Sequence, residues 1–158
     1  MQQQIVTNPE PGIRQRGELS LGTILLVEDE DFVRNVTCKI LRVAGYEVFA
    51  TRTVEEAAKV FIEQSSSIAL LLADIVLPKR SGSDLARELR ALRPDLKVML
   101  ISGYPRAQVG ALLPPDSDFS YLEKPFSAET LVKEISRVLR GAPQPLRSLL
   151  RADLRRAF

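Results

Sequence analysis

The 158-residue sequence predicts an α/β fold, a doubly wound parallel sheet of five strands with helices on both faces. Two observations support this prediction. Short runs that are almost wholly apolar, such as 23–27 and 68–74, are typical of strands buried on both faces. These runs alternate with segments of helical periodicity, and the alternation favours parallel strands joined by crossover helices. The length is sufficient for one domain with a sizeable core.

The first predicted strand, 23–27, is followed by a helix and a second strand. Gly45 ends the helix, which runs from Asp31 to Ala44, because glycine readily adopts the backbone conformation that follows a helix. The nearly alternating residues 46–50 predict the second strand. The helix is predicted by apolar residues at helical spacing, which are Phe32, Val36, Ile40 and Val43.

The middle of the chain predicts a helix, a strand and another helix. Thr53 and Glu56 have the spacing of a capping box, and they open a helix that runs to about Gln64. The apolar run 68–74 predicts the third strand. Residues 81–94 predict a helix with serines at its start and a proline at its end.

The last part of the fold repeats the alternation. Residues 97–102 and 118–123 predict the fourth and fifth strands, and 127–141 predicts the last helix. Residues 104–115 predict only a poor helix, because prolines interrupt it early and end it. These prolines are Pro105, Pro114 and Pro115.

Composition excludes several classes of protein. The formal net charge is +2, so the chain is no strong polyelectrolyte. One cysteine, Cys38, allows no intrachain disulfide, and we interpret it as a small apolar helix residue. The absence of histidine excludes His-based general base catalysis, His-ligated zinc and a phosphohistidine on this chain. With no signal-peptide core and no apolar run of membrane-spanning length, we expect a cytoplasmic protein without membrane insertion.

The chain is predicted to have three parts. Residues 1–20 are Gln-rich and aperiodic and predict a disordered N-terminal tail, 21–141 form the folded domain, and 142–158 form a basic amphipathic C-terminal tail with helical spacing. We interpret this last tail as a solvated or self-docked helix, and a dimer or partner-docking helix is the alternative. Four arginines with one phenylalanine do not favour nucleic-acid binding.

Acidic residues follow two of the apolar runs. Glu28 and Asp29 come after the first predicted strand, and Asp74 ends the third. The functional crevice of an open α/β sheet lies at the carboxyl ends of its strands. If the strand order is 2-1-3-4-5, the three acids converge at one rim, with Ser102 and Lys124 across the crevice.

These residue types suit phosphoryl transfer. Carboxylates held close together repel, and a hard divalent cation such as Mg²⁺ would compensate them through oxygen ligands. Asp74 can act as a nucleophile and form an acyl phosphate. Lys124 can neutralise one phosphoryl oxygen, and the Ser102 hydroxyl can donate a hydrogen bond to another.

Four fragments together resemble one family. "LLVEDE", "LLLADIVLP", "ISGY" and "YLEKPF" match, in order and spacing, the response-regulator receiver domain, the phosphoacceptor module of two-component signalling. Each fragment alone is weakly specific, but all four at strand ends are highly specific. The resemblance runs from about residue 22 to residue 140. The pattern is most similar to receivers of hybrid sensor kinases, and we expect a stand-alone receiver here.

The resemblance implies a flavodoxin-like fold with strand order 2-1-3-4-5. It implies Mg²⁺ bound by Glu28, Asp29, Asp74 and the backbone carbonyl of Val76. It also implies that Asp74 receives its phosphoryl group from a histidine of a sensor kinase or phosphotransfer protein, which fits a chain without histidine. Such a protein is not an ordinary enzyme, although it promotes its own phosphorylation and dephosphorylation, and it signals to a downstream protein partner.

Two further expectations concern the loop after the fourth strand. Ser102 and Tyr121 occupy the positions at which the family has a switch, in which the aromatic ring turns inward when the hydroxyl approaches the phosphoryl group. Val76 and Tyr104, which flank the expected site, offer no carboxamide or carboxylate to orient an attacking water. We therefore expect slow self-dephosphorylation.

Simpler interpretations and rival functions exist. Asp74 could be an ordinary acid at a strand end, and we interpret Glu30 and Asp31 as capping or solvated residues. The first rival function is a phosphorylation-independent interaction module on the same fold. A flavodoxin-like enzyme or nucleotide binder is disfavoured because the chain has no Gly-rich phosphate loop and no catalytic histidine. A nucleic-acid-binding regulator would act through the basic tail.

Overall fold

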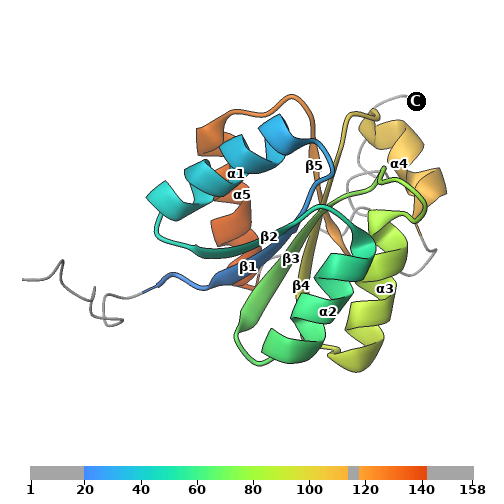
Figure 1. The fold of residues 1–158 in the computed structure, drawn as a ribbon. Helices are drawn as coiled ribbons and strands as arrows, with labels where there is room; N and C mark the ends of the chain where they lie inside the picture. Colours follow the sequence, from blue (N-terminus) through green and yellow to red (C-terminus); the bar gives the residue numbers. More distant parts are fainter. Residues whose placement is uncertain (1–19, 114–117, 142–158) are drawn as a thin grey trace, which may run out of the picture.

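The sheet follows directly from the apolar runs. In the computed structural model, which describes residues 20–113 and 118–141, five parallel strands lie in the order β2-β1-β3-β4-β5 (Figure 1). This order confirms the predicted fold. The strands are β1 (Thr23–Val27), β2 (Glu47–Thr51), β3 (Ile68–Asp74), β4 (Lys97–Ser102) and β5 (Ser120–Glu123).

Three of the strands, β1, β3 and β4, coincide with the predicted ranges, and the other two differ slightly. β1 and β3 match because an apolar run bounded by polar residues leaves little choice of ends. β2 begins one residue later than predicted, and β5 begins two residues later, at Ser120. The register places Leu25 of β1 between Phe49 of β2 and Leu71 of β3.

Helices cover both faces of this sheet. α1 and α5 lie on one face, and α2 and α3 lie on the other (Figure 1). The helices are α1 (Asp31–Val43), α2 (Val54–Gln64), α3 (Gly82–Leu92), α4 (Arg106–Leu112) and α5 (Ala128–Leu139). α4 is shorter than the predicted 104–115 because it begins only after Pro105, which is its N-cap residue.

The core has one layer on each side of the sheet. Successive side chains of β1 point to opposite faces, so Leu25 packs with the α2 and α3 side while Ile24 and Leu26 pack with the α1 and α5 side. All three residues are fully buried. Because β1 is buried on both faces, nearly all of its residues are apolar.

The apolar spacing correctly predicted α1 but does not mark its buried face. Phe32 is 75% exposed and Val43 is 81% exposed, although both belong to the predicted stripe. The residues that α1 buries are Thr37, Cys38 and Leu41. Cys38 therefore packs in the core, as interpreted from the sequence. The choice of face is made by the contact of α1 with the sheet and α5.

Side-chain caps begin three of the helices. Thr53, Ser81 and Ser127 each accept a hydrogen bond from the backbone N–H three residues further along. The predicted capping box at Thr53 forms only in part. The Glu56 carboxylate accepts a hydrogen bond from the N–H of Arg52 rather than from that of Thr53.

Several expectations concern parts of the chain that the structure does not describe. Residues 1–19 of the expected disordered tail, the basic tail 142–158, and Pro114 and Pro115 lie outside the described residues. Within 20–113 and 118–141, every helix is too short or too polar to cross a lipid bilayer.

Candidate functional site

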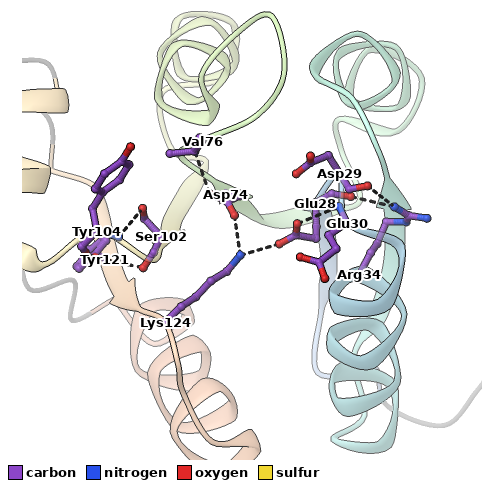
Figure 2. A network of polar contacts seen from close by, with 10 residues as sticks. All are labelled: Glu28, Asp29, Glu30, Arg34, Asp74, Val76, Ser102, Tyr104, Tyr121 and Lys124. Atoms are coloured by element: carbon purple, nitrogen blue, oxygen red, sulfur yellow. Dashed lines mark hydrogen bonds and ion pairs between the residues drawn. The ribbon is translucent and has the colours of Figure 1, made fainter.

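The candidate site lies at the carboxyl edge of the sheet, where the ends of four strands carry the predicted site residues. β1 leads into Glu28 and Asp29, β3 ends at Asp74, β4 ends at Ser102, and β5 is followed by Lys124. Figure 2 shows the Lys124 side chain extending into the space between Asp74 and Glu28. The parallel strands and their order are what bring residues so distant in sequence to one edge.

Lys124 joins two carboxylates in a single network. Its Nζ lies 2.6 Å from Asp74 Oδ2 and 3.0 Å from Glu28 Oε2. The long side chain of Lys124 thus extends from the end of β5 to the two acids. Burial alone would lower the pKa of Lys124, but the hydrogen bonds to Asp74 and Glu28 outweigh it and raise the pKa above its ordinary value. Lys124 is thus a permanent cation at neutral pH.

The Asp74 carboxylate is buried and oriented at both oxygens. The residue is 7% exposed, its Oδ2 accepts from Lys124, and its Oδ1 accepts the N–H of Val76 at 2.8 Å. Asp74 borders a cavity of about 260 Å³, whose other lining residues are Val76, Ser102, Gly103 and Tyr104. The cavity gives a small group direct access to the carboxylate.

The two acids after β1 differ in their surroundings. Glu28 is 2% exposed, and its Oε1 accepts the N–H of Glu30 at 3.1 Å while its Oε2 accepts from Lys124. Asp29 is exposed, and its carboxylate has no hydrogen-bond or ion-pair partner among residues 20–113 and 118–141. Asp29 is consequently available to a ligand from solvent.

The donor set fits a divalent cation in charge and chemistry. Glu28, Asp29 and Asp74 with Lys124 leave a formal charge of −2, and oxygen is the ligand that Mg²⁺ prefers. In the described part of the chain, no three acidic, cysteine or histidine side chains converge into a ready metal cluster. Lys124 separates Glu28 from Asp74, while Asp29 faces solvent.

Ser102 lines the cavity beside Asp74, and Tyr121 contacts the loop that follows Ser102. Ser102 is fully buried, and its Oγ accepts the N–H of Tyr104 at 3.1 Å. The Tyr121 ring is buried too, and its hydroxyl donates to the carbonyl oxygens of Tyr104 and Ser102. The tyrosine is therefore turned inward and held by hydrogen bonds to the loop that follows β4.

Sequence reasoning missed two residues that shape the site, Arg34 and Gly82. Arg34 donates to the backbone carbonyls of Glu28 and Asp29. A Cβ at Gly82 would lie 2.0 Å from the carbonyl oxygen of Asp74, so only glycine lets α3 begin this close to the end of β3. A glycine directly after the Ser81 cap was a usable signal, because helix initiation does not require it. Nothing in the spacing pointed to Arg34.

Comparisons with known proteins identify one family. The sequence profile of the response regulator receiver domain matches residues 24–136. Among curated proteins, the chain is 39% identical over 123 residues to the response regulator receiver protein CpdR of Brucella abortus, covering 75% of this chain and 98% of CpdR. It is 37% identical over 117 residues to the sensor kinase CckA of Brucella abortus, covering 74% of this chain but only 12% of that kinase.

Solved structures show the same fold. The receiver domain of a hybrid histidine kinase CckA superposes with a TM-score of 0.64 at 35% identity, covering 75% of this chain and 99% of that one. The response regulator TrrA of Thermotoga maritima, solved in complex with Mg²⁺ and BeF, has a TM-score of 0.62 at 28% identity, covering 74% of this chain and 98% of that one. The profile match, the strand order and the similarity to CpdR together show that this chain belongs to the response-regulator receiver domain family of two-component signalling.

Proposed function

We propose that this protein accepts a phosphoryl group on Asp74, with Mg²⁺ as its cofactor, and signals through contact with another protein. The observation that supports this proposal most directly is the environment of the Asp74 carboxylate. Its carboxylate is buried at the end of β3, held by Lys124 at 2.6 Å, and open to a cavity of about 260 Å³. A carboxylate that is oriented yet reachable is what a phosphoacceptor requires.

The side chains around Asp74 have separate roles in the proposed transfer. An oxygen of Asp74 attacks phosphorus while the bond from phosphorus to the donor breaks, and the electron pair of that bond leaves with the donor. Lys124 neutralises charge on a phosphoryl oxygen, because its Nζ already lies beside the acceptor carboxylate. The Ser102 hydroxyl turns from its contact with the Tyr104 N–H to donate to a phosphoryl oxygen.

The metal would be held by Glu28, Asp29 and Asp74, with the backbone carbonyl of Val76 as a further ligand. It would supply positive charge at the phosphoryl oxygens during transfer. The formal charge of −2 that Glu28, Asp29 and Asp74 carry together with Lys124 supports this assignment, as does the Asp29 carboxylate, which has no partner among the described residues. TrrA, which this chain resembles, was solved in complex with Mg²⁺ and BeF.

We propose that phosphorylation alters the conformation of the loop after β4. Ser102 and Tyr121 are both bonded to this loop, Ser102 through the Tyr104 N–H and Tyr121 through the Tyr104 carbonyl. Movement of the Ser102 hydroxyl toward a phosphoryl group would release one of these contacts. The surface near Tyr104 and α4 would then differ between the two states of the protein.

The proposed donor is a histidine of a sensor kinase or of a phosphotransfer protein. The chain has no histidine, and its relatives include a sensor kinase and a response regulator receiver protein. We assign the receiver to residues 21–141, with 1–20 and 142–158 as flanking segments. A homodimer formed through the basic segment is a further expectation, which sedimentation of the phosphorylated protein would test.

The deciding experiment is phosphorylation by a small acyl phosphate with Mg²⁺, followed by the mass of the intact protein. We expect one phosphoryl adduct that requires Mg²⁺ and is absent from Asp74→Asn. Asp95→Asn is the matched control, because Asp95 is an exposed aspartate between α3 and β4. If neither acyl phosphate nor histidine kinases gave an adduct, a phosphorylation-independent interaction module would replace this proposal.

A further inference from the structure

Arg34 is a partly buried cation whose side chain is directed at the backbone of the acidic site. It lies in the first turns of α1, and its side chain is only 11% exposed. Its Nη1 donates to the carbonyl oxygen of Glu28 at 3.0 Å and to that of Asp29 at 3.4 Å. Figure 2 shows the guanidinium beside the main chain of these two acids, on the side away from Lys124.

The same guanidinium is itself fixed in place. Its Nη2 forms an ion pair with the carboxylate of Asp31, and Arg52, the residue after β2, also pairs with that carboxylate. The hydrogen bond from Arg34 lowers the pKa of Asp31, and the positive charge of Arg52 contributes, so Asp31 stays ionised at neutral pH. The planar fork of Arg34 thus spans from α1 to the end of β1.

These contacts give Arg34 a structural role that is distinct from neutralising the nearby carboxylates. Its donors meet main-chain carbonyls, so they restrain the direction in which the Glu28 and Asp29 side chains leave the backbone. We propose that Arg34 is a positioning residue that holds these two carboxylates in the orientation that binds Mg²⁺. This inference rests on the proposed function, since it deepens the role of the same site.

A positioning role and a purely electrostatic role predict opposite changes in Mg²⁺ affinity when Arg34 is replaced. If Arg34 acted only as a nearby positive charge, its removal would make the site more negative, and Mg²⁺ would bind more tightly. If Arg34 holds the carbonyls, its removal frees the loop after β1, and Mg²⁺ binds more weakly. Loss of a residue that orients metal ligands typically weakens metal affinity by about tenfold to a hundredfold.

Arg52 is a matched control. It carries the same charge and pairs with the same Asp31 carboxylate, but it is 58% exposed and makes no contact with the carbonyls of Glu28 or Asp29 among the described residues. Replacing Arg52 removes a positive charge without removing the restraint. We expect Arg52→Gln to change Mg²⁺ affinity by less than about twofold, because an exposed charge is screened by solvent and salt.

The experiment is a Mg²⁺ titration of the whole chain, followed by amide NMR signals, for the parent, Arg34→Gln, Arg34→Lys and Arg52→Gln. The NMR signals of two backbone amides report on the carboxylates of the site. The Glu30 N–H is bonded to the Glu28 carboxylate and the Val76 N–H to that of Asp74. Without Mg²⁺, Arg34→Gln should shift the Glu30 signal and leave the Val76 signal nearly unchanged.

We expect about tenfold weaker Mg²⁺ binding in Arg34→Gln, with partial rescue in Arg34→Lys, which retains one donor group. Saturating Mg²⁺ should restore the phosphoryl adduct, since only ligand orientation is impaired. Equal or tighter Mg²⁺ binding in Arg34→Gln would overturn the inference while the proposed function stood. If the parent itself bound no Mg²⁺, the proposed function and the inference would both fall.

Discussion

The Nζ atom of Lys124 lies 2.6 Å from Oδ2 of Asp74, across 50 residues of sequence. The same nitrogen lies 3.0 Å from Glu28, so one ammonium group serves two buried carboxylates. This relationship ties β5 to β3 and β1 at the carboxyl edge of the sheet. It makes the stability of the site depend on a cation, either the lysine or a bound metal ion.

Removing the ammonium should therefore destabilise the protein in the absence of Mg²⁺. In Lys124→Met, the carboxylates of Glu28 and Asp74 would face each other without a partner. We expect the free energy of unfolding to fall by about 2 kcal/mol, less than for a fully buried pair because the lysine is partly exposed. Urea unfolding with and without Mg²⁺ measures this loss, and Mg²⁺ should stabilise the variant more than the parent.

The control for this prediction is Lys59→Met, which replaces an exposed lysine on α2. This variant should unfold like the parent with or without Mg²⁺. Equal stability of Lys124→Met and the parent in metal-free buffer would contradict the ion-pair account.

The same ion pair predicts a dependence of stability on alkaline pH. The pKa of Lys124 is raised in the folded protein above its ordinary value of 10.5, so folding favours the protonated lysine. Its contribution to stability is fully present below about pH 10.5 and is lost as pH rises through the raised pKa. The difference in unfolding free energy between the parent and Lys124→Met should stay constant from neutral pH to about 10 and shrink above it. A difference that shrank already near neutrality would show that the raised pKa is wrong.

Gly82→Ala should disturb Asp74 through the backbone. The new Cβ would lie 2.0 Å from the Asp74 carbonyl oxygen and 3.3 Å from the Cβ of Ala73, so α3 and the end of β3 must separate. We expect a loss of about 1–3 kcal/mol in stability, as for overpacking, together with slower phosphorylation. Thermal unfolding and the rate of adduct formation measure the two effects.

Gly103→Ala provides the comparison for stability. A Cβ at Gly103 would meet no atom within 4 Å, so its unfolding should change little. If Gly82→Ala unfolded no more readily than Gly103→Ala, the close approach of α3 to Asp74 would be refuted.

The phosphoryl group on Asp74 should be lost slowly, and Val76→Asn should speed its loss. Val76 and Tyr104 both line the cavity beside Asp74, and neither can orient a water molecule as a carboxamide can. An added carboxamide that positions the attacking water should accelerate hydrolysis by about tenfold. The decay of the adduct, followed by mass spectrometry, gives the rate.

Val76→Leu tests whether shape alone matters, since the leucine side chain is apolar but has the same number of heavy atoms and the same branching as asparagine. Its adduct should decay at the parent rate. A Val76→Asn adduct as persistent as that of the parent would exclude water orientation at this position as the limiting factor.

The sequence by itself determined the fold class and which acidic and hydroxyl side chains stand at the strand ends. The continuous apolar runs of β1 and β3 predict strands that are buried on both faces. The alternation of these runs with helical segments predicts the parallel sheet. Because the carboxyl ends of parallel strands meet at one edge, strand ends alone brought Glu28, Asp74 and Ser102 together. Such inferences succeed because periodicity and strand direction are local properties of the chain.

Only the tertiary structure decided how these residues are held. The buried face of α1 is set by its packing against the sheet and α5, so its exposed Phe32 could not be foreseen from spacing. Lys124 lies between two carboxylates, and Arg34 meets the carbonyls of Glu28 and Asp29, because long side chains bridge gaps that local patterns do not encode. The acidic residues can be identified from the sequence. Their orientation depends on contacts that form only when the sheet and its helices have assembled.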